Sequence, residues 1–205
     1  MSTRTSDFSF TRVEQYASRR FREAMQIYQA EFPAQSRLSI TKIRQLLRSG
    51  KYQLFVASGG EQVVGFALLW VCKQPAFVHL DYIAVSQEKK GQGVGTLLYR
   101  WLLTHLTKLS PRASLLTLEV DDELVGFYQR SYTRVLQDVP YLFPGRQGPL
   151  PMNLMVYDIL ERTTLNGRLV QNVIRALYRG IHNRGENDSL LRSFLSLVPR
   201  SVSLA

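Results

Sequence analysis

The pattern of apolar and polar positions changes most clearly between Phe77 and Leu106. Residues 77–85, FVHLDYIAV, form a strand-length run of apolar, aromatic and β-branched residues broken only by His79 and Asp81. A polar, glycine-rich stretch follows. Apolar residues then recur at helical spacing, namely Leu97, Leu98, Trp101, Leu102 and Leu106. The sequence therefore predicts a strand, a tight turn and a helix in direct succession.

The chain before this stretch predicts two strands and two helices around a hairpin. Residues 8–13 alternate as a short strand does, and residues 17–31 place apolar side chains at helical spacing until Pro33 ends the pattern. Ser39 or Thr41 is the expected cap of a second helix, which runs through Arg48 to Gly50. Residues 52–57 and 62–71 are expected to pair as strands because Ser58-Gly59-Gly60 is a typical hairpin turn.

The chain after this stretch predicts further strands and then helices. Strands are expected at residues 115–120, 132–137 and 153–159, with a helix at 122–130 and a Pro- and Gly-rich loop at 139–151. Residues 165–197 have a helical pattern that is interrupted at Asn183-Arg184-Gly185. We interpret this last region as a helical hairpin packed on the domain, with a dimer arm and a membrane-surface helix as alternatives.

The turn after the central strand has the composition of a phosphate-binding loop. Gly91, Gly93 and Gly95 fall within five positions, and glycines let the backbone approach an anion while the first amides of the helix point toward it. A dinucleotide motif G-x-G-x-x-G would need its third glycine one position later than Gly95. A P-loop would need a lysine before Thr96, and none is present there.

Composition narrows the class of protein. The chain has 205 residues, of which 45% are hydrophobic, which is enough for one domain with a full core or a domain with an appendage. The longest apolar run, residues 63–72, is too short to cross a bilayer, and the N-terminus has no apolar core of a secretory signal. The single cysteine, Cys72, excludes a disulfide framework and favours a cytoplasmic location.

The net charge of +10 lies mostly outside the middle of the chain. Residues 1–50 contribute +5, residues 51–150 contribute +2 and residues 151–205 contribute +3. Such a charge attracts nucleic acid or acidic lipid. Because no nucleic-acid-binding motif accompanies it, we interpret the excess as solvated helix surface and expect no nucleic-acid partner.

The segment Lys90-Gly91-Gln92-Gly93-Val94-Gly95 resembles the Gln/Arg-x-x-Gly-x-Gly/Ala signature of the GNAT superfamily of acyl-CoA-dependent N-acyltransferases, with Lys90 at the Gln/Arg position. The strand Ile83–Val85 before it, the leucine pair after it and the order of predicted elements are similar to that family as well. The resemblance implies an α/β fold with a mixed, mostly antiparallel sheet flanked by helices. We then expect a disordered N-terminus at residues 1–8, the GNAT domain at 9–160 and a C-terminal helical extension at 161–205.

The resemblance also implies the cofactor site. Acetyl-CoA would be the co-substrate, its pyrophosphate held by the loop and its pantetheine arm lying along the main chain of the preceding strand. The cofactor-binding residues are then Ile83, Ala84, Val85, Lys90, Gly91, Gln92, Gly93, Val94, Gly95 and Thr96. Lys90 keeps a cation near the phosphates but cannot form the two-pronged contact of an arginine.

Catalysis of acyl transfer to an amine needs an acid for the departing thiolate and a base for the amine. The Phe127-Tyr128 pair resembles a Phe-Tyr-x-x-x-Gly-Phe segment of the family, which makes Tyr128 the expected acid, although Tyr132-Thr133 replaces Gly-Phe. The candidates for the base are His79, Asp81 and Glu119, or a water molecule. His79 and Asp81 are two residues apart on one strand and so share a face unless a bulge turns them apart.

Other chemistries find no support in the sequence. The three histidines, His79, His105 and His182, have no metal-ligand spacing, and the chain has no G-x-S-x-G elbow for a serine nucleophile. The expected function is an N-acetyltransferase acting on a primary amine of a small molecule or peptide. The alternative is an acyl-CoA-binding module of the same fold without turnover. The sequence does not indicate the acceptor, and homodimerisation stays open.

Overall fold

The computed structural model describes residues 8–145 and 148–205. Residues 1–7, for which disorder is expected, lie outside the described residues, and Phe8 is half-buried. By its internal contacts the chain divides into two compact units, residues 1–71 with 80–109 and residues 72–79 with 110–205. Within the described ranges, no helix is both long enough and apolar enough to cross a membrane.

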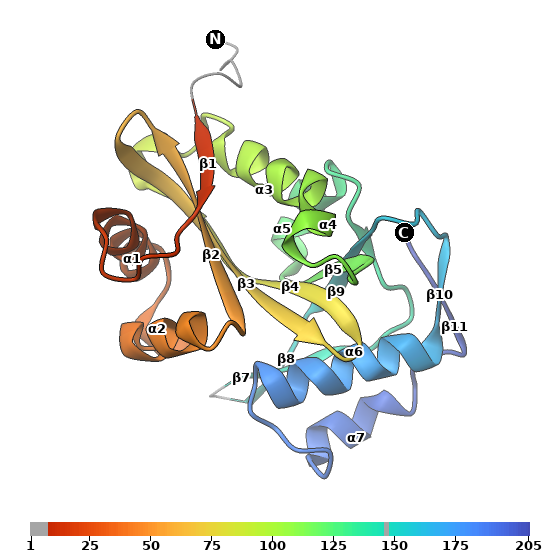
Figure 1. The fold of residues 1–205 in the computed structure, drawn as a ribbon. Coiled ribbons are helices and arrows are strands. Elements are labelled where there is room, and N and C mark those ends of the chain that lie inside the picture. Colours follow the sequence, from red (N-terminus) through yellow and green to blue (C-terminus); the bar gives the residue numbers. More distant parts are fainter. Residues whose placement is uncertain (1–7, 146–147) are drawn as a thin grey trace. The chain divides into compact units, whose positions relative to one another are not determined.

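The first unit is built on the strands that the N-terminal half predicts. Its strand order is β1-β2-β3-β4, and the β1–β2 and β2–β3 pairs are antiparallel. The strands are β1 (Ser9–Arg12), β2 (Tyr52–Gly59), β3 (Gln62–Lys73) and β4 (Ala76–Val85). Its helices are α1 (Arg19–Glu31), α2 (Ile40–Arg48), α3 (Val94–Thr104) and α4 (Leu106–Leu109), with short 3₁₀ turns at Ala34–Ser36 and Gln87–Lys89. Figure 1 shows α1 and α2 on one side of these strands and α3 on the other.

Local signals explain where these helices begin and end. The Ser18 hydroxyl accepts from the Phe21 amide at the start of α1, and Ser39, not Thr41, caps α2 by accepting from the Lys42 amide. The buried residues of α1 recur at helical spacing, and α2 ends before Gly50, whose φ of +70° is left-handed. The predicted hairpin is confirmed: β2 and β3 are joined through Gly60, with a φ of +61°.

The second unit carries the remaining strands in the order β4-β5-β9-β6. The β4–β5 pair, which joins His79 to Thr117 in register, is parallel, whereas β5–β9 and β6–β9 are antiparallel. The sheet pairing is therefore mixed and mostly antiparallel, which confirms the predicted fold class. The elements are β5 (Leu115–Val120), α5 (Asp122–Gln129), β6 (Arg134–Val135), β9 (Asn153–Asp158), α6 (Gly167–Gly180) and α7 (Ser189–Leu195).

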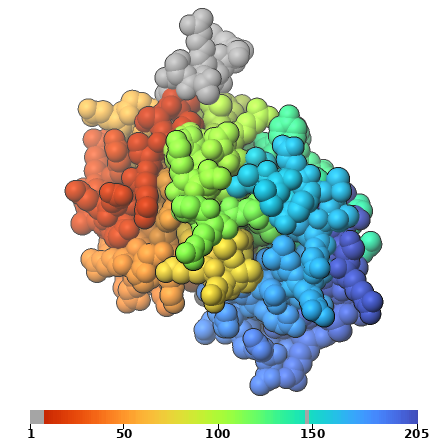
Figure 2. Space-filling model, turned by 45° about the vertical axis from the view of Figure 1, so that its right-hand side comes forward, coloured from red at the N-terminus to blue at the C-terminus, as the bar shows by residue number. Residues whose placement is uncertain are grey.

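The region after residue 138 differs from its prediction in two places. The expected loop contains a hairpin, β7 (Leu142–Gly145) with β8 (Gly148–Pro151), and the expected helical extension also contains the paired strands β10 (Thr164–Asn166) and β11 (Ser201–Ser203). Both strands of the β7–β8 pair contain proline, which has no amide to donate to a strand ladder. The sequence therefore predicted a loop here instead of a hairpin. In the space-filling view the blue atoms of the chain after residue 150 form one continuous body (Figure 2).

The two C-terminal helices are packed rather than extended. The helical pattern predicted for residues 165–197 is confirmed in α6, whose apolar residues Val173, Ile174 and Leu177 are buried. The Gln171 side chain donates to the Leu195 carbonyl, which joins α6 to α7. The interruption at Asn183 is confirmed, because this residue has a left-handed φ of +54° after α6 ends. The boundary of the GNAT domain at residue 160 stays a prediction.

Candidate active site

The end of β4 and the glycine-rich loop form one candidate site, which lies within the first unit. Residues 83–85 are half-buried, and the Ser86 amide donates to the Val64 carbonyl at 2.8 Å. A side chain at Gly65 would come within 3.1 Å of the Ala84 carbonyl oxygen, so glycine permits the close approach of the two backbones here. The main chain of residues 83–85 therefore leads directly into the loop.

The loop is open where its glycines lie. Gly91 and Gly93 have left-handed φ values of +74° and +80°, and a Cβ added at either would have nothing within 4 Å. Gly93 is the N-cap of α3 and offers no side-chain cap to the helix. The amides of the first turn, from Val94 to Thr96, have no acceptor within the helix, because the first intrahelical bond is Leu97 to Gly93. This geometry suits an anion at the helix N-terminus.

Lys90 has a partner that the sequence did not indicate. Its ammonium forms an ion pair with the Glu31 carboxylate at the end of α1, and half of the lysine side chain is exposed. Glu31 also borders a surface depression of about 410 Å³ between α1, the start of β3 and residues 86–88. The charge of Lys90 is thus partly neutralised by the protein itself, which limits what it can add to phosphate binding.

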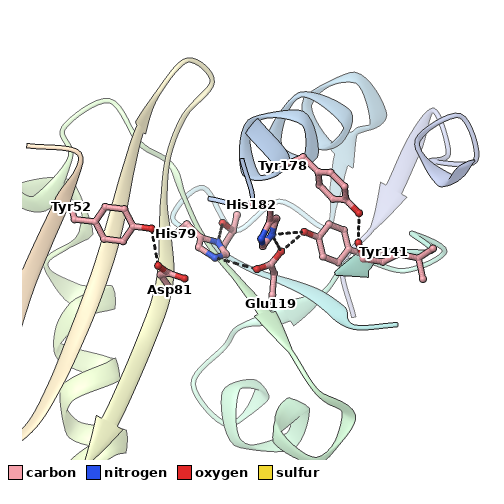
Figure 3. Close-up of polar contacts among 9 residues, drawn as sticks. Tyr52, His79, Asp81, Glu119, Tyr141, Tyr178 and His182 are labelled. Atoms are coloured by element: carbon pink, nitrogen blue, oxygen red, sulfur yellow. Dashed lines mark hydrogen bonds and ion pairs between the residues drawn. The ribbon is translucent and has the colours of Figure 1, made fainter. Parts of the chain in front are cut away.

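Two of the three base candidates meet in the second unit. His79 on β4 lies with its Nδ1 3.0 Å from the Thr117 hydroxyl, and its Nε2 is 3.7 Å from Glu119 Oε2 on β5 (Figure 3). The side chain of His79 is 1% exposed and that of Glu119 is 7% exposed. Glu119 is therefore the more accessible of the two.

Two further residues of this cluster were missed by sequence reasoning. His182, just after α6, places its Nε2 2.7 Å from Glu119 Oε1, and the Tyr141 hydroxyl donates to the same oxygen (Figure 3). The Tyr141 hydroxyl also lies 3.4 Å from His182 Nε2. Tyr141 is 22 positions and His182 is 63 positions from Glu119 in the sequence, so no local sequence pattern could have predicted these contacts. We call His79, Thr117, Glu119, Tyr141 and His182 the Glu119 cluster.

Electrostatics assign different charges to the members of the Glu119 cluster. Burial lowers the pKa of His79 to about 4, so this imidazole is neutral at pH 7 and forms no ion pair with Glu119. Burial alone would raise the pKa of Glu119, but the hydrogen bond and charge of His182 outweigh it, so the pKa lies below its usual value. Glu119 is therefore ionised at neutral pH. Burial also holds the pKa of Tyr141 well above its ordinary value, so its phenol remains a donor.

The other two predicted catalytic residues lie elsewhere in the structure. Asp81, in the first unit, accepts a 2.7 Å hydrogen bond from the Tyr52 hydroxyl (Figure 3). Tyr128, in the second unit, is buried near the end of α5 with its ring edge-on to Phe127. Burial raises the pKa of Tyr128 to about 12, which keeps its phenol protonated at neutral pH.

The segment after α5 shows how this chain replaces the expected glycine. Tyr132 stands at the glycine position of the Gly-Phe pair and adopts a left-handed φ of +62° with 82% of its surface exposed. Thr133, at the phenylalanine position, is fully buried. The turn therefore keeps a glycine-like backbone without a glycine.

Comparison with known sequences decides the family. The sequence model described as the Acetyltransferase (GNAT) family matches residues 19–132, more than half of the chain. The chain belongs to the GNAT acetyltransferase family. It is therefore an acyltransferase of the acetyl-CoA-dependent N-acetyltransferase type. The matched residues include the glycine loop, Glu119 and Tyr128, whereas Tyr141 and His182 lie beyond them. No curated protein matches the chain in sequence.

Solved structures show the GNAT fold. A GNAT-family protein from Bacteroides thetaiotaomicron is 20% identical with a TM-score of 0.65, over 85% of this chain and 97% of that one. The ribosomal-protein-S18-alanine N-acetyltransferase from Escherichia coli is 21% identical with a TM-score of 0.57, over 74% and 94%. An aminoglycoside 6′-N-acetyltransferase complexed with coenzyme A is 12% identical with a TM-score of 0.60, over 75% and 98%.

Across residues 8–145 and 148–205, no group of three or more His, Cys, Asp or Glu side chains is arranged to hold a metal ion.

Proposed function

We propose that this GNAT protein transfers an acetyl group from acetyl-CoA to a primary amine of a small molecule or peptide by direct attack. The observation that carries the proposal is the open loop at the start of α3, with two left-handed glycines and unused first-turn amides. A loop of this geometry inside the residues matched to the family is suited to a pyrophosphate. The coenzyme A complex of the structurally similar aminoglycoside acetyltransferase supports the choice of ligand.

The cofactor is held chiefly by backbone in this proposal. The amides of Gly91 and of residues 93–96 face the pyrophosphate, whereas the Gln92 amide donates to the Lys89 carbonyl at 3.4 Å within the loop. The main chain of residues 83–85 binds the pantetheine arm. Gln92 stabilises the loop itself, since its side-chain amide donates to the Glu88 carbonyl at 2.9 Å. Lys90 adds long-range attraction but is shared with Glu31. Binding through amides makes the glycines, rather than the lysine, the residues on which affinity depends.

Glu119 is the base that we favour among His79, Asp81 and Glu119. It is ionised at neutral pH, and it is less deeply buried than His79, which has a pKa of about 4. Asp81 is engaged by the Tyr52 hydroxyl, which favours a role in holding β2 to β4. Glu119 would accept the proton that a protonated amine must lose before it attacks, directly or through one water molecule. The amine nitrogen then forms a bond to the acetyl carbonyl carbon as the carbon–sulfur bond breaks.

Tyr128 is the proposed acid for the departing thiolate. A phenol with a pKa of about 12 stays protonated at neutral pH and can donate to a sulfur anion. The products are an N-acetyl amine and coenzyme A, with one proton released overall. Removal of the Tyr128 hydroxyl should therefore slow the chemical step while leaving cofactor binding intact.

The acceptor class rests on similarity of fold and is the broadest part of the proposal. The two structurally similar enzymes named above act, by their names, on an alanine of a ribosomal protein and on an aminoglycoside. Both are amines, which supports an amine acceptor, either a peptide or a small molecule.

The proposed location is the cytoplasm, since the buried Cys72 forms no disulfide and fits a reducing compartment. We propose no nucleic-acid partner, and homodimerisation stays a prediction for sedimentation to test.

The proposal is tested by release of free thiol from acetyl-CoA across a panel of amines and peptides. We expect turnover with at least one acceptor, and we expect Tyr128→Phe to lower kcat by about 10- to 100-fold with little change in the KM for acetyl-CoA. Phe127→Leu, a change beside it that keeps the hydroxyl, serves as the control. Tight binding of coenzyme A without turnover on any acceptor would instead support the binding module.

A further inference from the structure

The segment that follows the residues matched to the family reaches the proposed base. We propose that His182 is a positioning residue that, with Tyr141, holds one oxygen of Glu119 so that the other oxygen receives the proton. This inference rests on the proposed function, in which Glu119 is the base. It makes the chain after residue 132 part of the active site rather than an appendage, because both positioning residues lie there.

The two oxygens of Glu119 have different surroundings. Oε1 accepts hydrogen bonds from His182 Nε2 at 2.7 Å and from the Tyr141 hydroxyl. Oε2 faces the Nε2 of the neutral His79 at 3.7 Å, a distance too long for a hydrogen bond. With both strong donors on Oε1, the lone pairs of Oε2 are the ones available to a proton from the acceptor amine.

His182 is itself held in place by its own segment. Its amide donates to the Leu177 carbonyl at 3.2 Å, and Asn183 turns the chain away in a left-handed conformation. The imidazole ring packs edge-on against Phe143 at 4.8 Å and against Tyr178 at 5.7 Å between ring centroids. Since Tyr178 also donates to the Leu142 carbonyl, the end of α6 and the start of β7 are tied together around the imidazole.

The charged and titratable groups that face Glu119 come from several elements. They are His79 from β4, Tyr141 before β7 and His182 after α6, and Thr117 of β5 itself acts through His79. Burial works against the carboxylate, while the bonds from His182 and Tyr141 work in its favour and prevail. Without His182, the Glu119 carboxylate is still desolvated by burial, but it loses the interaction that most stabilises its charged form. Its pKa then rises, and less of it is ionised at a given pH.

The predicted consequence is a change in pH dependence, not only in rate. In wild type the carboxylate stays ionised well into the acidic range, so a group with a depressed pKa should limit activity only at low pH. In His182→Leu the acidic limb of kcat/KM should move to higher pH by about one unit, the effect of losing one hydrogen bond to a charged group. The loss of rate in this variant should approach tenfold at pH values below the acidic limb of wild type, and it should shrink as the pH rises toward neutrality.

The experiment compares His182→Leu with His182→Gln, whose side-chain amide can still donate, and with Arg179→Ala, an exposed change on α6. We measure pH profiles of thiol release and the titration of the Glu119 carboxyl carbon by NMR in the free protein. We expect both the acidic limb and the carboxyl titration to move upward in His182→Leu and to lie closer to wild type in His182→Gln. Arg179→Ala and the KM for acetyl-CoA should be unchanged.

Two results would overturn the inference. The first is an unchanged Glu119 titration in His182→Leu, which decides the matter even if wild type releases no thiol and the proposed function fails. The second is active wild type with an equal loss in His182→Leu and His182→Gln and no movement of the acidic limb, since that pattern marks a packing role. Failure of the inference and failure of the proposed function are thereby separated.

Discussion

Replacement of Gly93 by alanine probes the cofactor loop with a single methyl group. Gly93 has a φ of +80° and caps α3, and an added Cβ would meet no protein atom within 4 Å. The change therefore costs only backbone strain, about 1–2 kcal/mol for a left-handed residue, offset by up to about 1 kcal/mol from a stiffer unfolded chain. The expected net loss of stability is about 1 kcal/mol, or about 2–4 °C in Tm for a chain of this size.

The effect on binding should be larger because the methyl group lies where the loop is open for an anion. Loss of one charge-assisted hydrogen bond costs about 1.5–3 kcal/mol, which weakens binding about 10- to 100-fold. The assay is calorimetric titration with coenzyme A at a temperature well below the Tm of either protein. Gly60→Ala is the matched control, since Gly60 has a φ of +61° and equally open surroundings in the β2–β3 hairpin.

The two variants should lose similar stability, but only Gly93→Ala should lose affinity. A Kd for Gly93→Ala within twofold of wild type would refute the reasoning that the first-turn amides of α3 hold the pyrophosphate. An equal loss of affinity in Gly60→Ala would refute it as well, because the effect would then come from general destabilisation.

Three further changes follow from particular contacts. Lys90→Ala should weaken coenzyme A binding by calorimetry less than about fivefold, because its charge is shared with Glu31; a larger loss would show that the lysine contacts the phosphates. Tyr132→Gly should raise Tm by about 1–3 °C by relieving an exposed left-handed tyrosine, and Tyr132→Ala, which keeps the strain, should give no gain. Gly167→Ala should lower Tm by about 4–8 °C, since its Cβ would lie 1.9 Å from the Pro199 carbonyl oxygen; Gly126→Ala, whose nearest neighbour is 3.8 Å away, should not.

Local sequence signals were sufficient for most of the fold. The Ser39 cap, the β2–β3 turn and the strand at residues 115–120 depend on neighbours in the chain, and each was found at its predicted place. The glycine loop could also be predicted from the sequence, because left-handed turns at helix ends are rich in glycine. The fold class followed from the resemblance of this loop, and of the order of the predicted elements, to the GNAT superfamily.

Contacts between distant residues could not be predicted in the same way. The Leu165↔Val202 pair of the β10–β11 ladder is 37 positions apart, and short polar strands of this kind carry no periodic pattern. The Glu119 cluster gathers side chains from β4, β5 and the chain after residue 140, so its members become neighbours only after packing. Asp81 looked equivalent to His79 by spacing alone, and only the structure assigns it to Tyr52.

Direct transfer from acetyl-CoA to the amine is tested by intact mass spectrometry of the protein and its acceptor in one reaction. The account predicts that the protein mixed with acetyl-CoA alone stays unacetylated. It also predicts that addition of an active acceptor yields one acetylated amine for each coenzyme A released. An acetylated protein that forms before the acceptor is added and then passes the group on would contradict it, as would coenzyme A release with no acetylated amine.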